Sequence, residues 1–229
     1  MMFTTAILLA AGKGMRFRSR TPKPLVKLGS RPLIVYPLEV LSRHPDIRDI
    51  IVVVNTESEK GITSILKSYN IKKVSRIVKG GARRQDSLGN ALKFADSRSK
   101  LILIHDAARP FISRKIISET IKAALKSRAV VSAVPVKATI KEGSRGKVKK
   151  TLNRNILWEI QTPQVFDKDL FIKAYKRFGK NNVTDDASLV EKLGEKVRLI
   201  TGSYFNIKIT TPEDMVFAQA IIRKKWNIG

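Results

Sequence analysis

The feature that most constrains the fold is an alternation of short apolar runs with longer amphipathic segments. Runs rich in Val, Ile and Leu occupy residues 6–10, 50–54, 74–78, 101–104 and 130–134, as is typical of strands buried on both faces of a mostly parallel sheet. Apolar residues at helical spacing fill residues 32–41, 57–69, 84–95 and 114–126. Ser113 predicts the N-cap of the last of these helices. The alternation therefore predicts a doubly wound α/β fold, whose ligands bind beyond the carboxyl ends of the strands.

The alternation breaks at "KATIKEGSRGKVKKTLNR", which begins at Lys137. This stretch alternates weakly around a Gly-Ser-Arg-Gly turn and is too polar to cover a core. We predict a β-hairpin arm at residues 136–153, inserted in a single domain of residues 1–229. The pattern fits an arm that contacts a second subunit, and it fits a solvated edge ribbon equally well. After the arm we expect helices at 168–178, 185–193 and 212–223, and strands at 197–200 and 206–209.

Composition narrows the classes of function. The chain has no Cys and only two His, His44 and His105, which excludes disulfides and thiolate nucleophiles and argues against a histidine metal cluster. No apolar stretch is long enough for a membrane span, so we expect a cytoplasmic protein. Lys and Arg number 45 against 19 Asp and Glu, a net charge of +26, which favours polyanionic ligands such as nucleotides or nucleic acid. Because the cations are scattered, nucleic-acid binding is not the expected main role.

The loop after the first apolar run, "LLAAGKGMRFRSRTPKPL" from Leu8, is built to hold phosphate. Gly12 and Gly14 let backbone N–H groups approach a ligand, and Arg16 and Lys23 add positive charge. A proline on each side of Lys23 restricts that part of the loop, which suits a cation that must meet developing charge. The spacing matches neither the dinucleotide fingerprint nor the Walker loop. A glycine-rich turn with incidental cations is the alternative interpretation.

Two further stretches follow predicted strands at the same edge of the sheet. In "GGARRQDSL" the glycines Gly80 and Gly81 permit close backbone approach, and Ser87 can bond a base edge. In "HDAARP" Asp106 is placed to accept from a hydroxyl or to act on Mg²⁺, which prefers carboxylate, phosphate and water oxygens. We expect His105 to be structural, because a single His at a strand end usually satisfies backbone groups.

Taken together, Ala-Ala-Gly-x-Gly-x-Arg, Pro-Lys, "GGARRQDSL", "HDAARP", "NRNILWEIQTPQVF", "TDDAS" and "NIKIT" resemble the family of 2-C-methyl-D-erythritol 4-phosphate cytidylyltransferases over nearly the whole chain. The resemblance implies a Rossmann-like nucleotidyltransferase fold and transfer of the cytidylyl group of CTP to that polyol phosphate in isoprenoid precursor synthesis. It also implies Mg²⁺ or another divalent cation, and a homodimer formed through the arm. The implied residues are Arg16, Lys23, Arg154 and Lys208 for catalysis; Ala10, Ala11, Gly12, Gly14, Gly80, Gly81, Arg84 and Ser87 for the nucleotide; and Asp106, Arg109, Thr139 and Thr162 for the second substrate, with Asp106 also a candidate metal ligand.

The chain departs from the family pattern at three positions. Ala82 stands where some relatives carry Asp, so base recognition there must rest on backbone groups; Ala138 replaces an Asp that often precedes Thr139; and Pro24 replaces a frequent Gln.

Two alternative functions stay open at this stage. One is a cytidylyltransferase for ribitol 5-phosphate or another polyol or sugar phosphate, and the other is a nucleic-acid-binding protein on the same scaffold.

Overall fold

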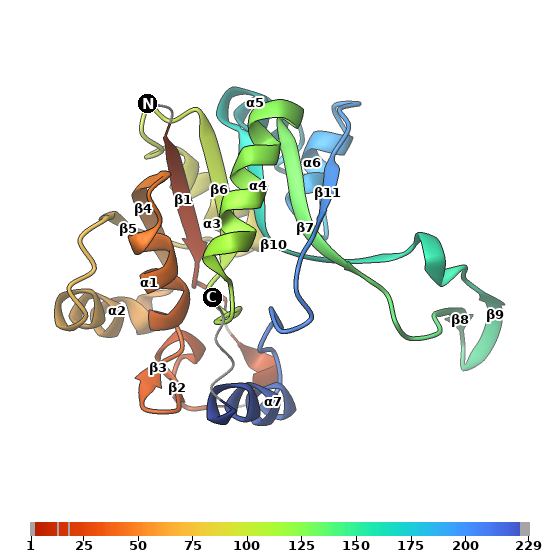
Figure 1. Cartoon of the computed structure of the whole chain (residues 1–229), viewed down its shortest axis with the longest axis horizontal. Coiled ribbons are helices and arrows are strands. Elements are labelled where there is room, and N and C mark those ends of the chain that lie inside the picture. Colours follow the sequence, from red (N-terminus) through yellow and green to blue (C-terminus); the bar gives the residue numbers. More distant parts are fainter. Residues whose placement is uncertain (1–2, 13, 18, 225–229) are drawn as a thin grey trace.

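A seven-stranded sheet forms the centre of the molecule (Figure 1). The computed structural model describes residues 3–12, 14–17 and 19–224. The strand order is β11-β7-β10-β6-β1-β4-β5, and only β10 runs antiparallel to its neighbours, which confirms the doubly wound, mostly parallel sheet. The strands are β1 (Thr4–Leu9), β4 (Ile47–Val54), β5 (Val74–Lys79), β6 (Leu101–Asp106), β7 (Ala129–Pro135), β10 (Trp158–Asp167) and β11 (Arg198–Thr201).

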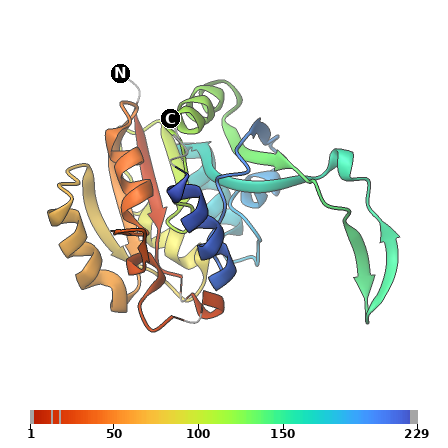
Figure 2. The same cartoon turned by 60° about the horizontal axis from the view of Figure 1, so that its bottom comes forward.

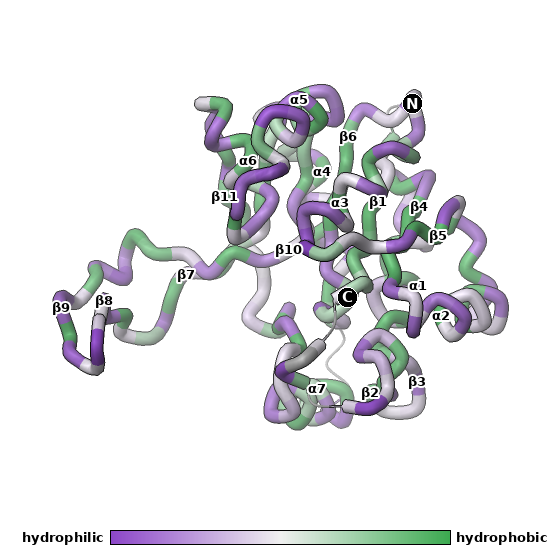
Figure 3. The backbone as a smooth tube through the Cα atoms, turned by 180° about the vertical axis from the view of Figure 1, so that it is seen from behind, coloured by the Kyte–Doolittle hydropathy of each residue, from purple (hydrophilic) through white to green (hydrophobic). Residues whose placement is uncertain are grey.

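Helices cover both faces of this sheet because successive strand residues point to opposite sides. Ala6 and Leu8 of β1 pack with α1, α2 and α4, while Ile7 between them packs with α3, α5 and α6. In Figure 3 the hydrophobic colour runs along β1, and hydropathy alternates along the covering helices. The helices are α1 (Val35–Arg43), α2 (Thr56–Ser68), α3 (Arg84–Leu92), α4 (Arg114–Ser127), α5 (Lys168–Phe178), α6 (Ala187–Glu191) and α7 (Pro212–Arg223). Within the described residues no helix is long and apolar enough to cross a membrane.

A third apolar cluster closes the sheet edge where the site lies. Met215 and Ala218 of α7 pack there with Leu28, Leu33 and Phe111. Leu28 belongs to a short ribbon, β2 (Lys27–Leu28) paired with β3 (Arg31–Pro32). Because Pro32 is used in this ribbon, α1 begins at Val35, three residues after the predicted start. Two 3₁₀ turns, Met15–Phe17 and Lys23–Leu25, carry the predicted phosphate loop past this edge.

The predicted strand at residues 206–209 is wrong. The segment between β11 and α7 is not paired as a strand. The contacts that hold it include a backbone hydrogen bond from Ile209 N to Ala108 O, 2.8 Å, and the buried Asn206, whose Nδ2 donates to Thr162 O at 2.8 Å. Lys208 therefore lies on an irregular segment, and its side chain is held by Asp106 at the end of β6, 2.7 Å from Lys208 Nζ.

The arm leaves the end of β7 and returns into β10, far from the body of the molecule (Figure 2). Its strands β8 (Lys141–Ser144) and β9 (Lys147–Thr151) pair antiparallel, and every residue in both is exposed. Arg145 and Gly146 have positive φ values of 51° and 75°, so the turn follows the Gly-containing sequence. The hairpin contains no buried side chain of its own.

Candidate active site

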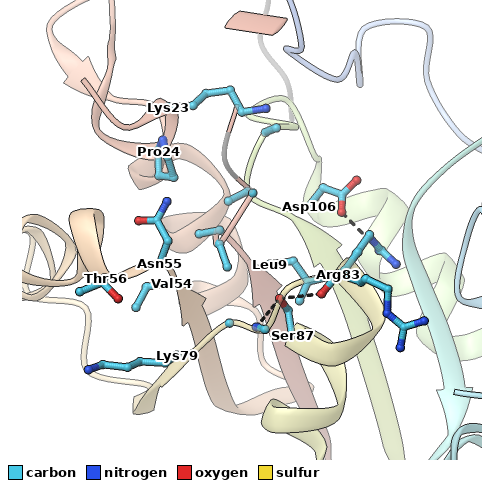
Figure 4. Close-up of a pocket in the computed structure, with 18 of the residues that line it drawn as sticks. Leu9, Lys23, Pro24, Val54, Asn55, Thr56, Lys79, Arg83, Ser87 and Asp106 are labelled. Atoms are coloured by element: carbon cyan, nitrogen blue, oxygen red, sulfur yellow. Dashed lines mark hydrogen bonds and ion pairs between the residues drawn. The ribbon is translucent and has the colours of Figure 1, made fainter. Parts of the chain in front are cut away.

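A cavity of about 310 Å³ lies beyond the carboxyl ends of β1, β4, β5 and β6 (Figure 4). Parallel strands end together at this edge, which is where doubly wound sheets bind ligands. The sequence-predicted residues that line it are Ala10, Ala11, Gly12, Lys23, Gly80, Gly81, Arg84, Ser87, Asp106 and Lys208. The fold thus brings four motifs that are distant in the sequence to one surface.

One end of the cavity is a tightly packed glycine turn. A Cβ added at Gly80 would overlap Ala11 Cβ and lie 2.9 Å from Ser87 Oγ, so only glycine fits there. Ser87 Oγ accepts from Gly81 N at 3.0 Å and donates to Arg83 O at 3.1 Å. Ser87 therefore shapes the turn, and its predicted contact with the base stays a prediction.

The phosphate loop is described only in part, because Lys13 lies outside the described residues. Gly12 has open space where a Cβ would be, as required if a ligand lies against the backbone. Gly14, with φ +62°, takes the left-handed conformation that glycine favours. Gly14 and Arg16 do not line the cavity, and Arg16 is exposed.

Asp106 is the buried centre of a charged cluster. It follows the last hydrophobic residues of β6 and meets Lys208 Nζ at 2.7 Å and Arg84 Nη2 at 3.3 Å. Burial alone would raise the pKa of Asp106, but the charges of Arg84 and Lys208 outweigh burial and hold that pKa well below its usual range. Asp106 is therefore an anion at any physiological pH and orients both cations.

Arg84, at the first turn of α3, is also bound by an acid that the sequence analysis did not select. Its Nη1 and Nη2 meet the two oxygens of Asp186 at 2.5 and 2.7 Å, and the Asp186 side chain is 1 % exposed. Burial would lower the pKa of Arg84, yet the two carboxylates raise it. Asp186 lies within the quoted "TDDAS" stretch, but its role becomes visible only when its partner, 102 residues away, is known.

Lys23 adds another cation to the cleft. Its Nζ donates to Ile209 O at 3.1 Å, and its pKa is lowered first by burial and then by the charge of Lys208, with Arg16 contributing in the same direction. Like charges are therefore held close together in the free protein. A polyphosphate would relieve this repulsion, so the arrangement favours a highly anionic ligand.

A second cavity of about 570 Å³ adjoins the first, and Arg84, Asp106 and Lys208 line both. The predicted substrate residues Arg109 and Thr162 lie on this second side. Arg109 is buried, its Nη1 donates to Asn206 O at 2.7 Å, and burial lowers its pKa. Two neighbouring cavities that share one charged wall can hold two anionic reactants face to face.

His105 lies beneath this wall and is fully buried. Asp106 N donates to Thr162 Oγ1 at 3.1 Å, so the Thr162 hydroxyl can give its proton to His105 Nδ1 at 2.9 Å. His105 Nε2 then donates to Arg109 O at 3.1 Å. Burial lowers the pKa of His105 to about 4, so the ring is neutral and acts as a structural link, as expected.

Arg154 and Thr139 lie apart from both cavities of their own chain. Arg154 begins a 3₁₀ turn, Arg154–Ile156, at the base of the arm. Its guanidinium is exposed and donates to Lys137 O at 3.0 Å. Within one chain the structure therefore does not join these two residues to the rest of the predicted site.

The cleft offers little for a metal centre built by the protein alone. No group of three His, Asp or Glu among the described residues is placed to hold a metal ion, and Asp106 is the one carboxylate in the cavity lining. Such a donor set fits a Mg²⁺ ion that takes most ligands from phosphate and water oxygens.

Asn55, Thr56 and Lys79 also line the cavity, and the sequence analysis did not select them. All three lie at or just after the carboxyl end of β4 or β5. The signal that could have found them is their position after a predicted strand, since this edge binds the ligand.

The chain is similar to known proteins over nearly its whole length. Residues 4–224 match the family model described as IspD: 2-C-methyl-D-erythritol 4-phosphate cytidylyltransferase. A protein of that name from Clostridioides difficile is 43% identical over 221 residues, covering 95% of this chain and 93% of the relative. One from Halalkalibacterium halodurans is 40% identical over 223 residues, covering 96% and 97%.

Solved structures give the same result. The crystal structure of 4-diphosphocytidyl-2C-methyl-D-erythritol synthase from Anaerococcus prevotii superposes with a TM-score of 0.87 at 37% identity, covering 97% of this chain and 96% of that one. The 2-C-methyl-D-erythritol 4-phosphate cytidylyltransferase from Thermus thermophilus gives a TM-score of 0.78 at 31% identity, covering 97% and 100%.

Proposed function

The chain belongs to the 2-C-methyl-D-erythritol 4-phosphate cytidylyltransferase family, and we propose that its two joined cavities are the place where the family reaction occurs. The chain transfers the cytidylyl group of CTP to 2-C-methyl-D-erythritol 4-phosphate, giving 4-diphosphocytidyl-2-C-methyl-D-erythritol and diphosphate for isoprenoid precursor synthesis. The observation that carries the proposal for the site is the charged wall of Arg84, Asp106 and Lys208 shared by both cavities.

In this reaction a phosphate monoester oxygen attacks the α-phosphorus of CTP in line, and the bond to diphosphate breaks. No protein nucleophile is needed, so the barrier lies in bringing two polyanions together and in stabilising the charge that shifts to the leaving group. Lys23 and Arg16 are proposed to stabilise the transition state from the phosphate loop. Lys208, held by Asp106 at 2.7 Å, is proposed to orient the attacking phosphate.

Nucleotide binding is proposed for the loop and the glycine turn. Backbone groups at Ala10 to Gly12, Gly14, Gly80 and Gly81 would contact CTP, while Ser87 and Arg84 fix the walls. The cavity volume of about 310 Å³ is at the small end of ligand pockets, which suits the single ring of a pyrimidine.

A divalent cation, Mg²⁺ or another, is part of the proposal, and it would be held by the CTP phosphates and water, with the Asp106 carboxylate, which lines the nucleotide cavity, in support. When bound, it would neutralise phosphate charge during transfer. Asp106 keeps its second role in the free protein, since its oxygens already orient Lys208 and Arg84.

We also propose that the chain acts as a homodimer in which the arm completes the partner's site. Arg154 and Thr139 are predicted to bind the polyol phosphate, yet in their own chain they lie outside the second cavity. The arm is fully exposed along both strands, and a hairpin of this kind needs a partner surface to be ordered by packing.

The test is diphosphate release by the purified chain with Mg²⁺ and CTP, with and without 2-C-methyl-D-erythritol 4-phosphate. Release should require both substrates. Ribitol 5-phosphate in place of the methylerythritol compound, and ATP, GTP or UTP in place of CTP, are the controls. Equal or faster release with ribitol 5-phosphate would contradict the assigned acceptor while leaving the chemistry intact.

A further inference from the structure

Lys208 reaches both cavities from a segment that is not paired as a strand. The segment lies between β11 and α7, and Lys208 Nζ is 2.7 Å from Asp106 Oδ2. On the C-terminal side of Lys208, Ile209 N donates to Ala108 O at 2.8 Å. Most residue types could make that backbone bond. On the N-terminal side, Asn206 is the one buried polar side chain that the structure describes between β11 and α7. The side chain of Asn206 is therefore the specific anchor of this segment.

The orientation of the Asn206 amide is set by the oxygens that face it. Its Nδ2 donates to Thr162 O at 2.8 Å and to Gln161 Oε1 at 3.4 Å. The Gln161 amide is itself fixed, because its Nε2 donates to Ser203 O at 2.9 Å. Only the nitrogen end of the Asn206 amide can therefore face Thr162 O, since two oxygens would repel each other. The backbone O of Asn206 also accepts from Arg109 Nη1 at 2.7 Å.

Thr162 is bonded to both sides of the ion pair between Lys208 and Asp106. Its carbonyl accepts from Asn206, two residues before Lys208. Its hydroxyl oxygen accepts from Asp106 N at 3.1 Å. Loss of the Asn206 bond would leave Asp106 attached to Thr162 but would release the chain that carries Lys208. The Asn206 amide therefore helps to set the position of Lys208 relative to Asp106 in the wall that the two cavities share.

We propose that Asn206 is a positioning residue for the reaction: its hydrogen bond to Thr162 O holds Lys208 where this cation can orient the attacking phosphate. The inference rests on the proposed function and assigns a role to a residue that lines neither cavity. Such a role affects the rate because a misplacement of about 1 Å can cost about 100-fold.

Asn206→Ala removes the amide donor and leaves the backbone bonds of the segment possible. We expect this variant to lower kcat/KM for 2-C-methyl-D-erythritol 4-phosphate by about 10- to 100-fold. The dissociation constant for CTP, measured by calorimetry, should change little, because the phosphate loop and the glycine turn are untouched. Asn206→Thr, which is close to asparagine in volume but has no amide, should give the same result without the cavity that alanine leaves.

The effect must act through Lys208, and a double-mutant cycle tests this. In a Lys208→Ala chain, Asn206→Ala should lower kcat/KM by about twofold at most, because the group that Asn206 positions is already absent. A purely structural role of Asn206 would instead give the same loss in both chains.

The matched control is Ser132→Ala. Ser132 is buried on β7, and its Oγ donates to Pro163 O at 3.1 Å, so this change removes a buried donor from the residue next to Thr162. Ser132 lines neither cavity and makes no contact with the segment that carries Lys208 through this bond. The variant should lower the unfolding temperature with little change in kcat/KM.

Three results would overturn the inference: wild-type kcat/KM in both Asn206 variants, equal losses from Asn206→Ala with and without Lys208, or an equal loss in Ser132→Ala. Each of these results leaves the proposed function intact if the wild-type chain releases diphosphate from CTP and 2-C-methyl-D-erythritol 4-phosphate. A wild-type chain that releases none would overturn the proposed function and, with it, the role of Asn206.

Discussion

Lys23 is the residue where burial and charge act most directly on the proposed chemistry. Its ammonium is held by one backbone carbonyl at 3.1 Å between the phosphate loop and Lys208, and both burial and the neighbouring cations lower its pKa. Burial and like charges destabilise the Lys23 ammonium in the free protein. The same ammonium therefore interacts strongly with the negative charge that develops on phosphate.

We therefore expect Lys23→Ala to lower kcat by about 100-fold or more, while the dissociation constant for CTP changes much less because the backbone loop remains. The measurement is steady-state diphosphate release together with CTP binding by calorimetry. A variant with near-normal kcat would remove Lys23 from catalysis.

His105 makes stability depend on pH. The pKa of His105 in the folded chain is about 4, below its ordinary value of 6.5, because burial disfavours the imidazolium. Between these two values the unfolded chain binds a proton that the folded chain does not. The free energy of unfolding should thus fall as the pH is lowered from about 6.5 towards 4, by about 1.4 kcal/mol per pH unit for this one proton.

Urea unfolding at several pH values, in the wild type and in His105→Gln, measures how much His105 contributes to the pH dependence of the free energy of unfolding. The variant should show a shallower dependence on pH, although His44, whose pKa burial also lowers, keeps a contribution of the same sign in both proteins. Equal slopes would show that His105 does not titrate as the structure predicts.

At the scale of elements, Arg84 of α3 binds both Asp186 at the start of α6 and Asp106 at the end of β6. Asp186 is the N-cap residue of α6 but makes no side-chain cap bond, so its buried carboxylate serves Arg84 alone among the described contacts. The contact between Asp186 and Arg84 therefore fixes the position of Arg84 in the charged wall that the two cavities share.

Asp186→Asn should lower the free energy of unfolding by about 2 kcal/mol, because the half-buried Arg84 guanidinium loses one of the two carboxylates that compensate its charge. It should also raise the KM for both substrates. Asp185→Asn is the neighbouring control: it keeps an oxygen for Ser188 N, which donates to Asp185 Oδ1 at 3.2 Å, and loses only the acceptor for Gln164 Nε2, which donates to Asp185 Oδ2 at 3.2 Å, so it should cost about 1 kcal/mol. Chemical denaturation of both variants measures the two changes in the free energy of unfolding. Equal decreases in the two variants would refute a special role for Asp186.

At the scale of the whole molecule, the arm makes a sharp prediction about assembly. If Arg154 acts in the partner's site, a heterodimer of a Lys23→Ala chain and an Arg154→Ala chain contains one intact site, formed by the core of the second chain and the arm of the first. Each variant alone should be nearly inactive, whereas chains mixed in the unfolded state and refolded together should regain about a quarter of wild-type activity, given statistical pairing of a dimer. No recovery in a mixture that forms dimers would place Arg154 in its own chain's site.

The net charge of +26 is also a property of the whole molecule. The chain should bind DNA weakly at low salt, because scattered cations attract any polyanion. Gel shifts at 50 and 200 mM salt should show this binding lost by at least about 10³-fold if several phosphates are contacted. Binding that survives 200 mM salt would revive the nucleic-acid-binding alternative.

The local parts of this fold follow from the sequence alone. The helices at 168–178 and 212–223 match the structure at both ends, because amphipathic spacing and adjacent caps are encoded within a few residues. The phosphate loop, the glycine turn and Asp106 could be found in the same way, since each is a short motif after a buried strand. The alternation of strands and helices then placed all three at one edge of the sheet.

The tertiary structure decided the features of the fold and the site whose residues depend on partners distant in the sequence. Strand β10 was missed because its buried Gln161, Thr162 and Gln164 look solvent-exposed until their partners are known. The irregular segment that carries Lys208 was mistaken for a strand, and Asp186 was not selected, for the same reason. Burying a polar side chain is favourable only when a partner satisfies it, and that partner is chosen by the fold. The sequence by itself therefore determined the scaffold and the chemistry of the loops, while only the tertiary structure decided which charges meet across the cleft.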